Sequence, residues 1–129
     1  MRAFLDANIL FSGSNPQSEL FWFLCYLRQS HSLVCSGFVL AEAERNLVLK
    51  RPAWVDSFHE VKSGLEIVPE SPLLVEVDLR DKDRPVLGAA IGGRCQFLLT
   101  GDKRDFGHLY GQSIEGVMVV DVVTLAELV

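Results

Sequence analysis

The amino-acid sequence predicts an α/β domain in which helices cover both faces of a central parallel sheet. Short apolar runs typical of buried strands alternate with longer helical stretches along the whole chain. The length of 129 residues, with 49% hydrophobic and 22% charged residues, matches one domain of ordinary size with one core. No internal repeat, low-complexity tract or linker interrupts residues 1–129, so we expect a single domain over this range.

The first half of the chain is predicted to contain two strands and three helices. Asn15 before Pro16 favours a helix start, because proline suits the first helical position. Ser36 is a suitable N-cap, and Gly64 is a suitable helix end. The expected elements are a strand over 2–5, a helix over 17–29, a strand over 33–35, a helix over 37–50 and a helix over 53–63.

The second half is predicted to continue the alternation. Apolar residues from Val86 to Ile91 recur at helical spacing, and Gly92 and Gly93 then end that helix. The expected elements are a short strand over 66–68, a helix after Asp83, a strand over 97–99, a polar turn over 103–112, a strand over 117–120 and a last helix, capped by Thr124, through 128. Residues 73–79 receive no firm assignment.

The helix over 17–29 is apolar around most of its circumference between Leu20 and Leu27. Such a helix either lies deep in the core or offers a face to a partner chain. We expect core placement. The same apolar run is far too short to span a bilayer, so no membrane segment is predicted.

The composition restricts the class of function. The formal net charge is −5, which argues against general binding to nucleic acid, because that binding depends on Lys and Arg at the phosphates. An acidic protein can still act on nucleic acid if its carboxylates hold divalent cations. No signal peptide is visible, and the three cysteines are widely spaced in apolar surroundings. We expect buried reduced thiols and a cytoplasmic location.

Acidic residues stand where predicted strands end or predicted helices begin. Taken alone, Asp6 reads as a turn residue, Asp83 as an N-cap and Asp102 as a turn residue. Taken together, they fall at one edge of the predicted sheet, where ligands of such folds bind. A Glu from the 37–50 helix is expected to join them, and periodicity alone does not decide between Glu42 and Glu44.

A cluster of carboxylates persists only with protons or cations between the charges. Oxygen ligands without a Cys or His spacing motif favour Mg²⁺ or Mn²⁺ over zinc. Such a cluster suits displacement at phosphorus, and basic residues beside Asp83 and Asp102 fit that use. His31, His59 and His108 share no ligand spacing, and we expect surface or packing roles for them.

Four short motifs occur in a specific order. They are Leu-Asp-Ala-Asn-Ile-Leu over 5–10, Ser36-x-x-x-Leu40-x-Glu42, Asp81-Lys-Asp83-Arg-Pro-Val-Leu87, and Leu99-Thr-Gly-Asp102-Lys-Arg-Asp105-Phe. Their combination resembles the PIN-domain nucleases over essentially the whole chain. The resemblance implies a three-layer α/β/α sandwich with a central parallel sheet. It also implies a Mg²⁺- or Mn²⁺-dependent ribonuclease that prefers single-stranded RNA.

The resemblance also implies roles for individual residues. The catalytic acids would be Asp6, Glu42, Asp83 and Asp102, a choice of Glu42 over Glu44 that the motif spacing makes. The supporting residues would be Asn8, Thr100 and Asp105. The metal ligands would be Asp6, Asp83, Asp102 and Asp105. Small stand-alone members resemble VapC-type toxins, which implies an RNA substrate, a small antitoxin partner and a homodimer.

These patterns are compatible with three functions. The leading hypothesis is a metal-dependent endoribonuclease, the toxin half of a toxin–antitoxin pair. The alternative is a non-catalytic PIN-like module that binds RNA or protein, and a full set of four acids argues against it. The third is an aspartyl-phosphate domain, for which a second Asp would be expected where Asn8 stands.

Overall fold

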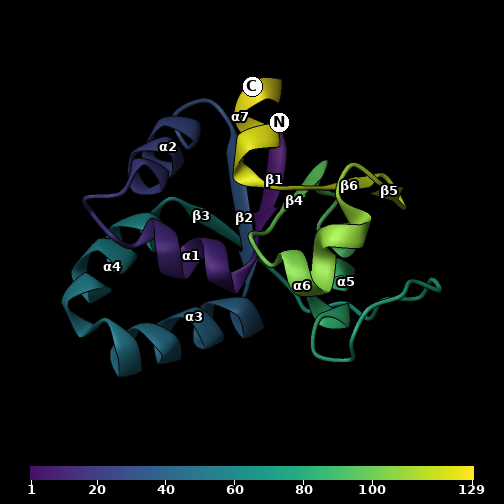
Figure 1. Cartoon of the computed structure of the whole chain (residues 1–129), viewed down its shortest axis with the longest axis horizontal. Helices are drawn as coiled ribbons and strands as arrows, with labels where there is room; N and C mark the ends of the chain where they lie inside the picture. The colour runs from purple at the N-terminus through teal and green to yellow at the C-terminus, as the bar shows by residue number, and fades with distance from the viewer.

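Six strands form one sheet with helices on both faces in the computed structural model, which describes all 129 residues (Figure 1). The predicted three-layer α/β/α fold is thereby confirmed. The strands are β1 (Arg2–Leu5), β2 (Ser32–Ser36), β3 (Leu65–Val68), β4 (Phe97–Leu99), β5 (Ser113–Ile114) and β6 (Val117–Val120). Their order is β3-β2-β1-β4-β6-β5, and every pair is parallel except β5 with β6.

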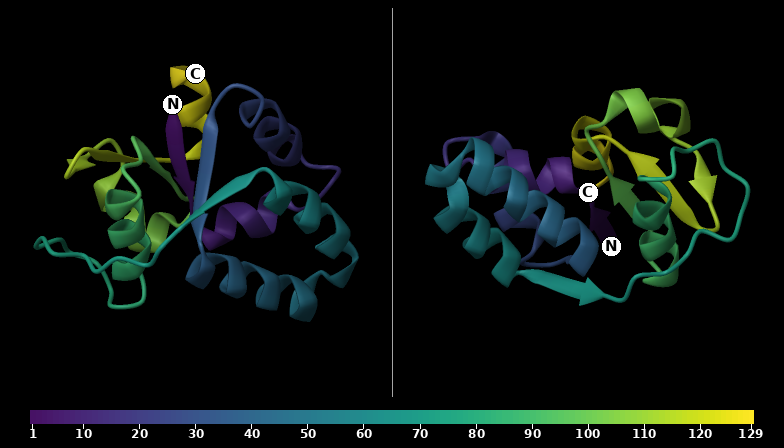
Figure 2. Two further views of the ribbon diagram at one scale, coloured as in Figure 1. Left: turned by 180° about the vertical axis from the view of Figure 1, so that it is seen from behind. Right: turned by 90° about the horizontal axis from the view of Figure 1, so that it is seen from below.

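Two groups of helices flank the sheet. α1, α2, α3 and α4 gather on one side, and α5 and α6 lie on the other (Figures 1 and 2). The helices are α1 (Ala7–Gly13), α2 (Glu19–Leu27), α3 (Gly37–Lys50), α4 (Val55–Ser63), α5 (Arg84–Gly92), α6 (Lys103–Phe106) and α7 (Val122–Leu128), with the 3-10 turns η1 (Pro52–Trp54) and η2 (Gly107–Leu109). None of the helices is long and apolar enough to cross a membrane.

The centre of the sheet is the place where the strand order reverses. The chain passes from β1 to β2 on one side and from β4 to β6 on the other, so the connections leave the β1–β4 pair in opposite directions. Open α/β sheets bind ligands in the crevice outside the carboxyl ends of such a pair. Asp6 directly follows β1, and Thr100 directly follows β4. The fold therefore brings two predicted site residues to this crevice.

The two central strands are also the most buried part of the core. Phe4, Leu5, Leu98 and Leu99 are fully buried. Continuous apolar runs of this kind are typical of parallel strands covered on both faces. Because the carboxyl ends of β1 and β4 are fixed by this packing, the polar residues that follow them hold defined positions.

Several elements differ from those that the sequence predicts, and α1 was not predicted at all. α2 begins at Glu19, because the Ser18 hydroxyl caps it by accepting from the amide of Phe21. α7 begins earlier than expected, since the Asp121 carboxylate caps it and accepts from the amide of Thr124, so Thr124 is not the cap. The predicted polar turn over 103–112 is wrong, because most of it forms α6 and η2.

The antiparallel strand β5 was not predicted. It pairs with β6 through a tight turn at Glu115 and Gly116, which have φ of 50° and 85°. Positive φ at both turn residues matches a type I′ hairpin turn, for which glycine is well suited at the second position. β5 consists of two residues, too short for an apolar pattern to reveal it.

α2 is only partly a core helix. Phe21, Leu24 and Leu27 are buried, as expected, whereas Trp22 is 65% exposed and Tyr26 is 62% exposed. Trp22 and Tyr26 are four residues apart and so share one face of the helix. The prediction of core placement therefore holds for one face of α2 and is wrong for the other.

A long connector without helix or strand, residues 69–80, joins β3 to the turn before α5. Its backbone is tied down by side chains, because the Arg84 guanidinium donates to the carbonyls of Leu73, Val75 and Val77 at 3.2–3.4 Å. His108 Nε2 lies 2.7 Å from the carbonyl oxygen of Asp78. This packing role agrees with the one expected for the histidine.

Candidate active site

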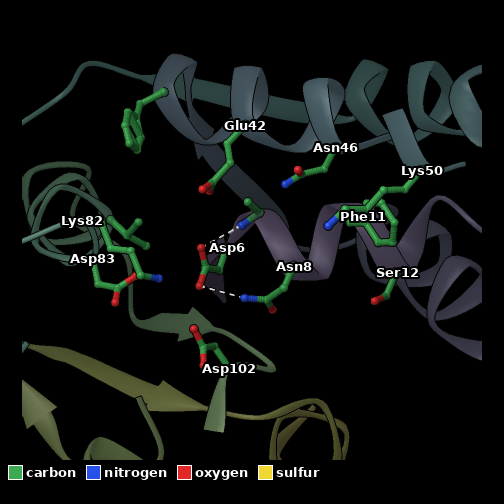
Figure 3. A pocket seen from close by; sticks show the side chains of 13 residues that line it. Asp6, Asn8, Phe11, Ser12, Glu42, Asn46, Lys50, Lys82, Asp83 and Asp102 are labelled. Atoms are coloured by element: carbon green, nitrogen blue, oxygen red, sulfur yellow. Dashed lines mark hydrogen bonds and ion pairs between the residues drawn. The ribbon is translucent and has the colours of Figure 1, made fainter. Parts of the chain in front are cut away.

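All four predicted catalytic acids line one cleft at the carboxyl edge of the sheet. Asp6 comes from the end of β1, Glu42 from α3, Asp83 from the start of α5 and Asp102 from the segment after β4. Figure 3 shows their carboxylates converging on the space between α3, α1 and the end of β4. Glu44 does not line the cleft. The choice of Glu42 over Glu44 thus agrees with the geometry.

Asp6 is held firmly in place at the base of the cleft. It is 5% exposed and caps α1, with Oδ1 accepting from the Ala7 amide at 2.8 Å. Its Oδ2 accepts from the Thr100 hydroxyl at 2.9 Å and from the Asn8 amide at 3.0 Å. Burial raises the pKa of Asp6 above its usual value, and these hydrogen bonds act in the opposite direction. The structure therefore places Asn8 and Thr100 where they can orient Asp6.

Thr100 connects both sides of the site. Besides its bond to Asp6, its Oγ1 accepts from the Asp102 amide at 3.2 Å. We expect Thr100→Val to lower the free energy of unfolding by about 1–3 kcal/mol, because an isosteric methyl leaves a buried acceptor of Asp6 without this donor. Thr100→Ser, which keeps the hydroxyl, is the matched control. Urea denaturation of both variants measures the difference, and equal losses would show that the hydroxyl is unimportant.

Asp83 carries the one buried side-chain oxygen that lacks a hydrogen-bond partner. The residue is 6% exposed, and its Oδ2 has no partner at all. It stands at the N-cap position of α5, but its side chain makes no capping bond, so the reading of Asp83 as a simple helix cap is wrong. Burial raises the pKa of Asp83 to about 6, and the positive charge of Lys82 acts against that rise.

Lys82 lies between two carboxylates. Its ammonium is 2.9 Å from Asp105 Oδ2 and 3.4 Å from Asp83 Oδ1. The hydrogen bond from Lys82 lowers the pKa of Asp105, while Arg80 adds a longer contact of 3.7 Å. A cation therefore already balances part of the negative charge at this end of the cleft. The sequence pointed to Lys82 only as one of several basic neighbours.

Three of the four predicted metal ligands form a compact group. One oxygen from each of Asp83, Asp102 and Asp105 lies within 4.8 Å of the others, a spacing that suits a single cation. Asp6 lines the same cleft but stands outside this group. An all-oxygen donor set with a partnerless buried oxygen at Asp83 suits Mg²⁺ or Mn²⁺. The residues present thus fit the metal that the resemblance implies.

The cleft continues beyond the acids into a part that the sequence analysis did not predict. Phe11 and Ser12 of α1 face Asn46 and Lys50 of α3 across it (Figure 3). A usable signal existed, since Asn46 and Lys50 follow Glu42 at intervals of four and so share its helix face. Without the packing of α1 on α3, nothing shows that this face borders a cleft.

The fold is shared with solved structures, although no protein-family model matches the chain and no match was found among curated proteins. VapBC2 from Rickettsia felis, solved with a DNA fragment from its promoter, is 20% identical over 94% of this chain and 98% of that chain, with a TM-score of 0.69. PAE2754 from Pyrobaculum aerophilum is 18% identical over 99% and 94%, with a TM-score of 0.68. This likeness confirms the predicted PIN-like fold. Since one fold can host many activities, it does not define the chemistry.

Proposed function

We propose that the protein is a metal-dependent endoribonuclease and the toxin half of a toxin–antitoxin pair. The observation that carries this proposal is the convergence of Asp6, Glu42, Asp83 and Asp102 in one cleft, with a buried oxygen of Asp83 left free for a cation. A non-catalytic structure gains nothing from such a cluster, because it repels the phosphates of a bound nucleic acid. The shared fold with VapBC2 of Rickettsia felis supports the toxin assignment.

Each side chain has a defined task in this proposal. Asp83, Asp102 and Asp105 would hold the metal together with Asp6, whose carboxylate is oriented by Asn8 and Thr100. The bound Mg²⁺ or Mn²⁺ supplies Lewis acidity, which lowers the pKa of water and offsets the charge of the phosphodiester. Glu42, whose side chain faces Asp6 across the cleft, accepts a proton from the attacking water.

We further propose a cytoplasmic protein that pairs with a small antitoxin and with a second copy of itself. The neighbour from Rickettsia felis was solved as a VapBC2 complex, which supports a partner for this fold. The exposed aromatic face of α2, Trp22 and Tyr26, is the apolar surface that suits one of these contacts.

One observation favours a second candidate, a PIN-like module that binds RNA or protein without catalysis. The ammonium of Lys82 already bridges Asp83 and Asp105, where a metal would otherwise balance their charge. In a module of this kind the carboxylates would serve the structure through Lys82 and would bind no metal. Metal binding and metal-dependent cleavage therefore separate the two candidates.

The decisive experiment is cleavage of a labelled single-stranded RNA with Mg²⁺, with Mn²⁺ and with EDTA. We expect the wild type to need metal and Asp102→Asn to be inactive, since asparagine retains a capping oxygen for α6 but not the charge. Glu44→Gln is the matched control, because it removes one negative charge from α3 outside the cleft. Calorimetry with Mn²⁺ accompanies the assay. A wild type that binds no metal, or cleaves equally in EDTA, would contradict the proposal.

A further inference from the structure

We propose that the extension of the cleft beyond the carboxylates binds the nucleotide next to the cleaved phosphodiester, through its base and its phosphate. This extension, the nucleotide arm, is formed by Phe11, Ser12, Asn46 and Lys50. The inference rests on the proposed nuclease function and concerns how the substrate is held. In this proposal Phe11 contacts the face of a base, Ser12 and Asn46 contact its edge, and Lys50 contacts a phosphate.

Helix geometry gives the arm its length. Glu42, Asn46 and Lys50 lie on one face of α3, and their backbones are about 6 Å apart per step at 1.5 Å rise per residue. The backbone of α3 therefore rises about 12 Å from the catalytic acid Glu42 to Lys50, a distance on the scale of one or two nucleotides. Phe11 and Ser12 form the opposite wall on α1 (Figure 3). The RNA next to the cleaved phosphodiester must lie along the protein surface. The arm is part of the same cleft as the acids and offers such a surface.

The charge of the arm differs from that of the centre. No carboxylate lines it beyond Glu42, and Lys50 forms no ion pair in the structure. The neighbouring Arg51 is engaged elsewhere, with its guanidinium 5.4 Å from the ring centre of Trp54. Lys50 is thus a free cation at the end of a groove that starts among acids. Phosphate is the part of RNA that such a group binds.

Phe11 is a fixed aromatic surface. Its ring meets Trp54 edge to face, with 5.7 Å between ring centres and 61° between planes. Arg51 lies over the Trp54 ring, so Phe11 belongs to a packed aromatic cluster and also borders the cleft. Aromatic rings of this kind stack on the bases of single strands. Bases of a duplex are already stacked on each other and cannot reach such a ring, which gives the single-strand preference.

Asn46 can recognise the base through hydrogen bonds. Its side-chain amide forms no hydrogen bond within the protein and points into the cleft (Figure 3). An amide offers both donors and an acceptor, which complement the edge of an unpaired base. The Ser12 hydroxyl on the opposite wall adds a second polar contact. A base stacked on Phe11 would present its edge to these two groups, and its phosphate would extend to Lys50.

The test separates RNA binding from cleavage. Binding of a short fluorescent single-stranded RNA is measured by anisotropy in Mg²⁺ at several salt concentrations, with the catalytically silent Asp102→Asn protein as host. We expect Lys50→Gln to weaken binding three- to tenfold and to reduce the salt slope by about 0.7, the value for one phosphate contact on a single strand. Lys62→Gln, an exposed lysine of α4 outside the cleft, is the charge-matched control and should change neither.

Cleavage in the otherwise native protein gives the second readout. Lys50→Gln should raise KM with kcat preserved, and Asn46→Ala should flatten the base preference at one position beside the cleavage site. Phe11→Leu should weaken single-strand binding about fivefold or more. Wild-type protein that neither binds nor cleaves RNA would overturn the proposed function itself. Cleavage with unchanged KM, base preference and salt slope in Lys50→Gln and Asn46→Ala would overturn the nucleotide arm alone. Equal binding of duplex and single-stranded RNA would do the same.

Discussion

Asp83→Asn is expected to abolish RNA cleavage and, in the same protein, to raise the stability of the metal-free fold. The rate should fall roughly 10²- to 10⁴-fold, because a metal ligand contributes several kcal/mol to the stabilisation of the transition state. Stability should rise on the order of 1 kcal/mol, because asparagine removes a buried negative charge that faces Asp102 and Asp105. Lys82 keeps its closer partner, Asp105, at 2.9 Å.

The stability gain should depend on pH in a defined window. The pKa of Asp83 is raised to about 6 in the folded protein from an ordinary value of 3.8. Between these values the folded state binds more protons than the unfolded state, so the contribution of Asp83 to stability falls as pH rises from about 4 to about 6. Below this window Asp83 is protonated, and its contribution to stability is nearly equal to that of asparagine. The advantage of Asp83→Asn should therefore appear through the window and stay constant above it.

Melting temperatures of wild type and Asp83→Asn, recorded in EDTA from pH 4 to pH 8, measure this difference. The subtraction cancels the other titrating groups, such as Asp6, which both proteins share. Adding Mn²⁺ at pH 7.5 should raise the melting temperature of the wild type and leave the variant nearly unchanged. A variant less stable than wild type at every pH would show that Asp83 supports the fold rather than the chemistry.

Gly88→Ala is expected to be the most destabilising single-methyl change in α5. A Cβ at this position would lie 2.2 Å from the carbonyl oxygen of Ser71 and 2.9 Å from the amide nitrogen of Leu73. Both atoms belong to backbone, so they cannot rotate away. The connector must move off α5, which should lower the free energy of unfolding by about 1–3 kcal/mol despite the better helix propensity of alanine. Thermal or urea denaturation measures the loss.

Gly37→Ala is the matched control for this change. Gly37 also lies in a helix, at the first position of α3, and its nearest neighbour for a Cβ is the end of the flexible Glu70 side chain at 3.6 Å. Alanine there should be neutral or slightly stabilising. We also expect Gly88→Ala to reduce cleavage, because the displaced connector leads directly to Lys82 and Asp83. Equal stability of the two variants would mean that the connector yields at little cost.

The sequence predicted the acids of the site better than their surroundings. Asp6 and Asp102 follow buried apolar runs, and strand ends of a parallel sheet meet at one edge, so their proximity follows from pattern alone. Glu42 was separated from Glu44 only through motif spacing, because α3 carries apolar residues on opposite sides. Lys82 could not be assigned, since its contact with Asp83 and Asp105 depends on how the turn before α5 meets α6.

The structure of the connector over residues 69–80 and the position of Phe11 could not be predicted from sequence patterns. Residues 69–80 carry no helix or strand signal, and three of their carbonyls accept from the side chain of Arg84 instead of from a neighbouring strand. Phe11 looks like an ordinary core residue in the sequence, and only the packing of α1 on α3 leaves its ring at the cleft. Both features arise from contacts between distant segments, which local propensity does not encode.

The central place of β1 in the sheet has a consequence for the order of folding. β1 is the first strand to be synthesised, yet one of its two edges stays open until β4 is made and pairs with it. The hydrogen bond from Thr100 to Asp6 closes a loop of 94 residues, and contacts of such separation form late and slowly. A nascent chain therefore carries its carboxylates scattered along a partly open sheet. They become one site only when the last central strand docks, so any activity of this centre begins with the completed fold.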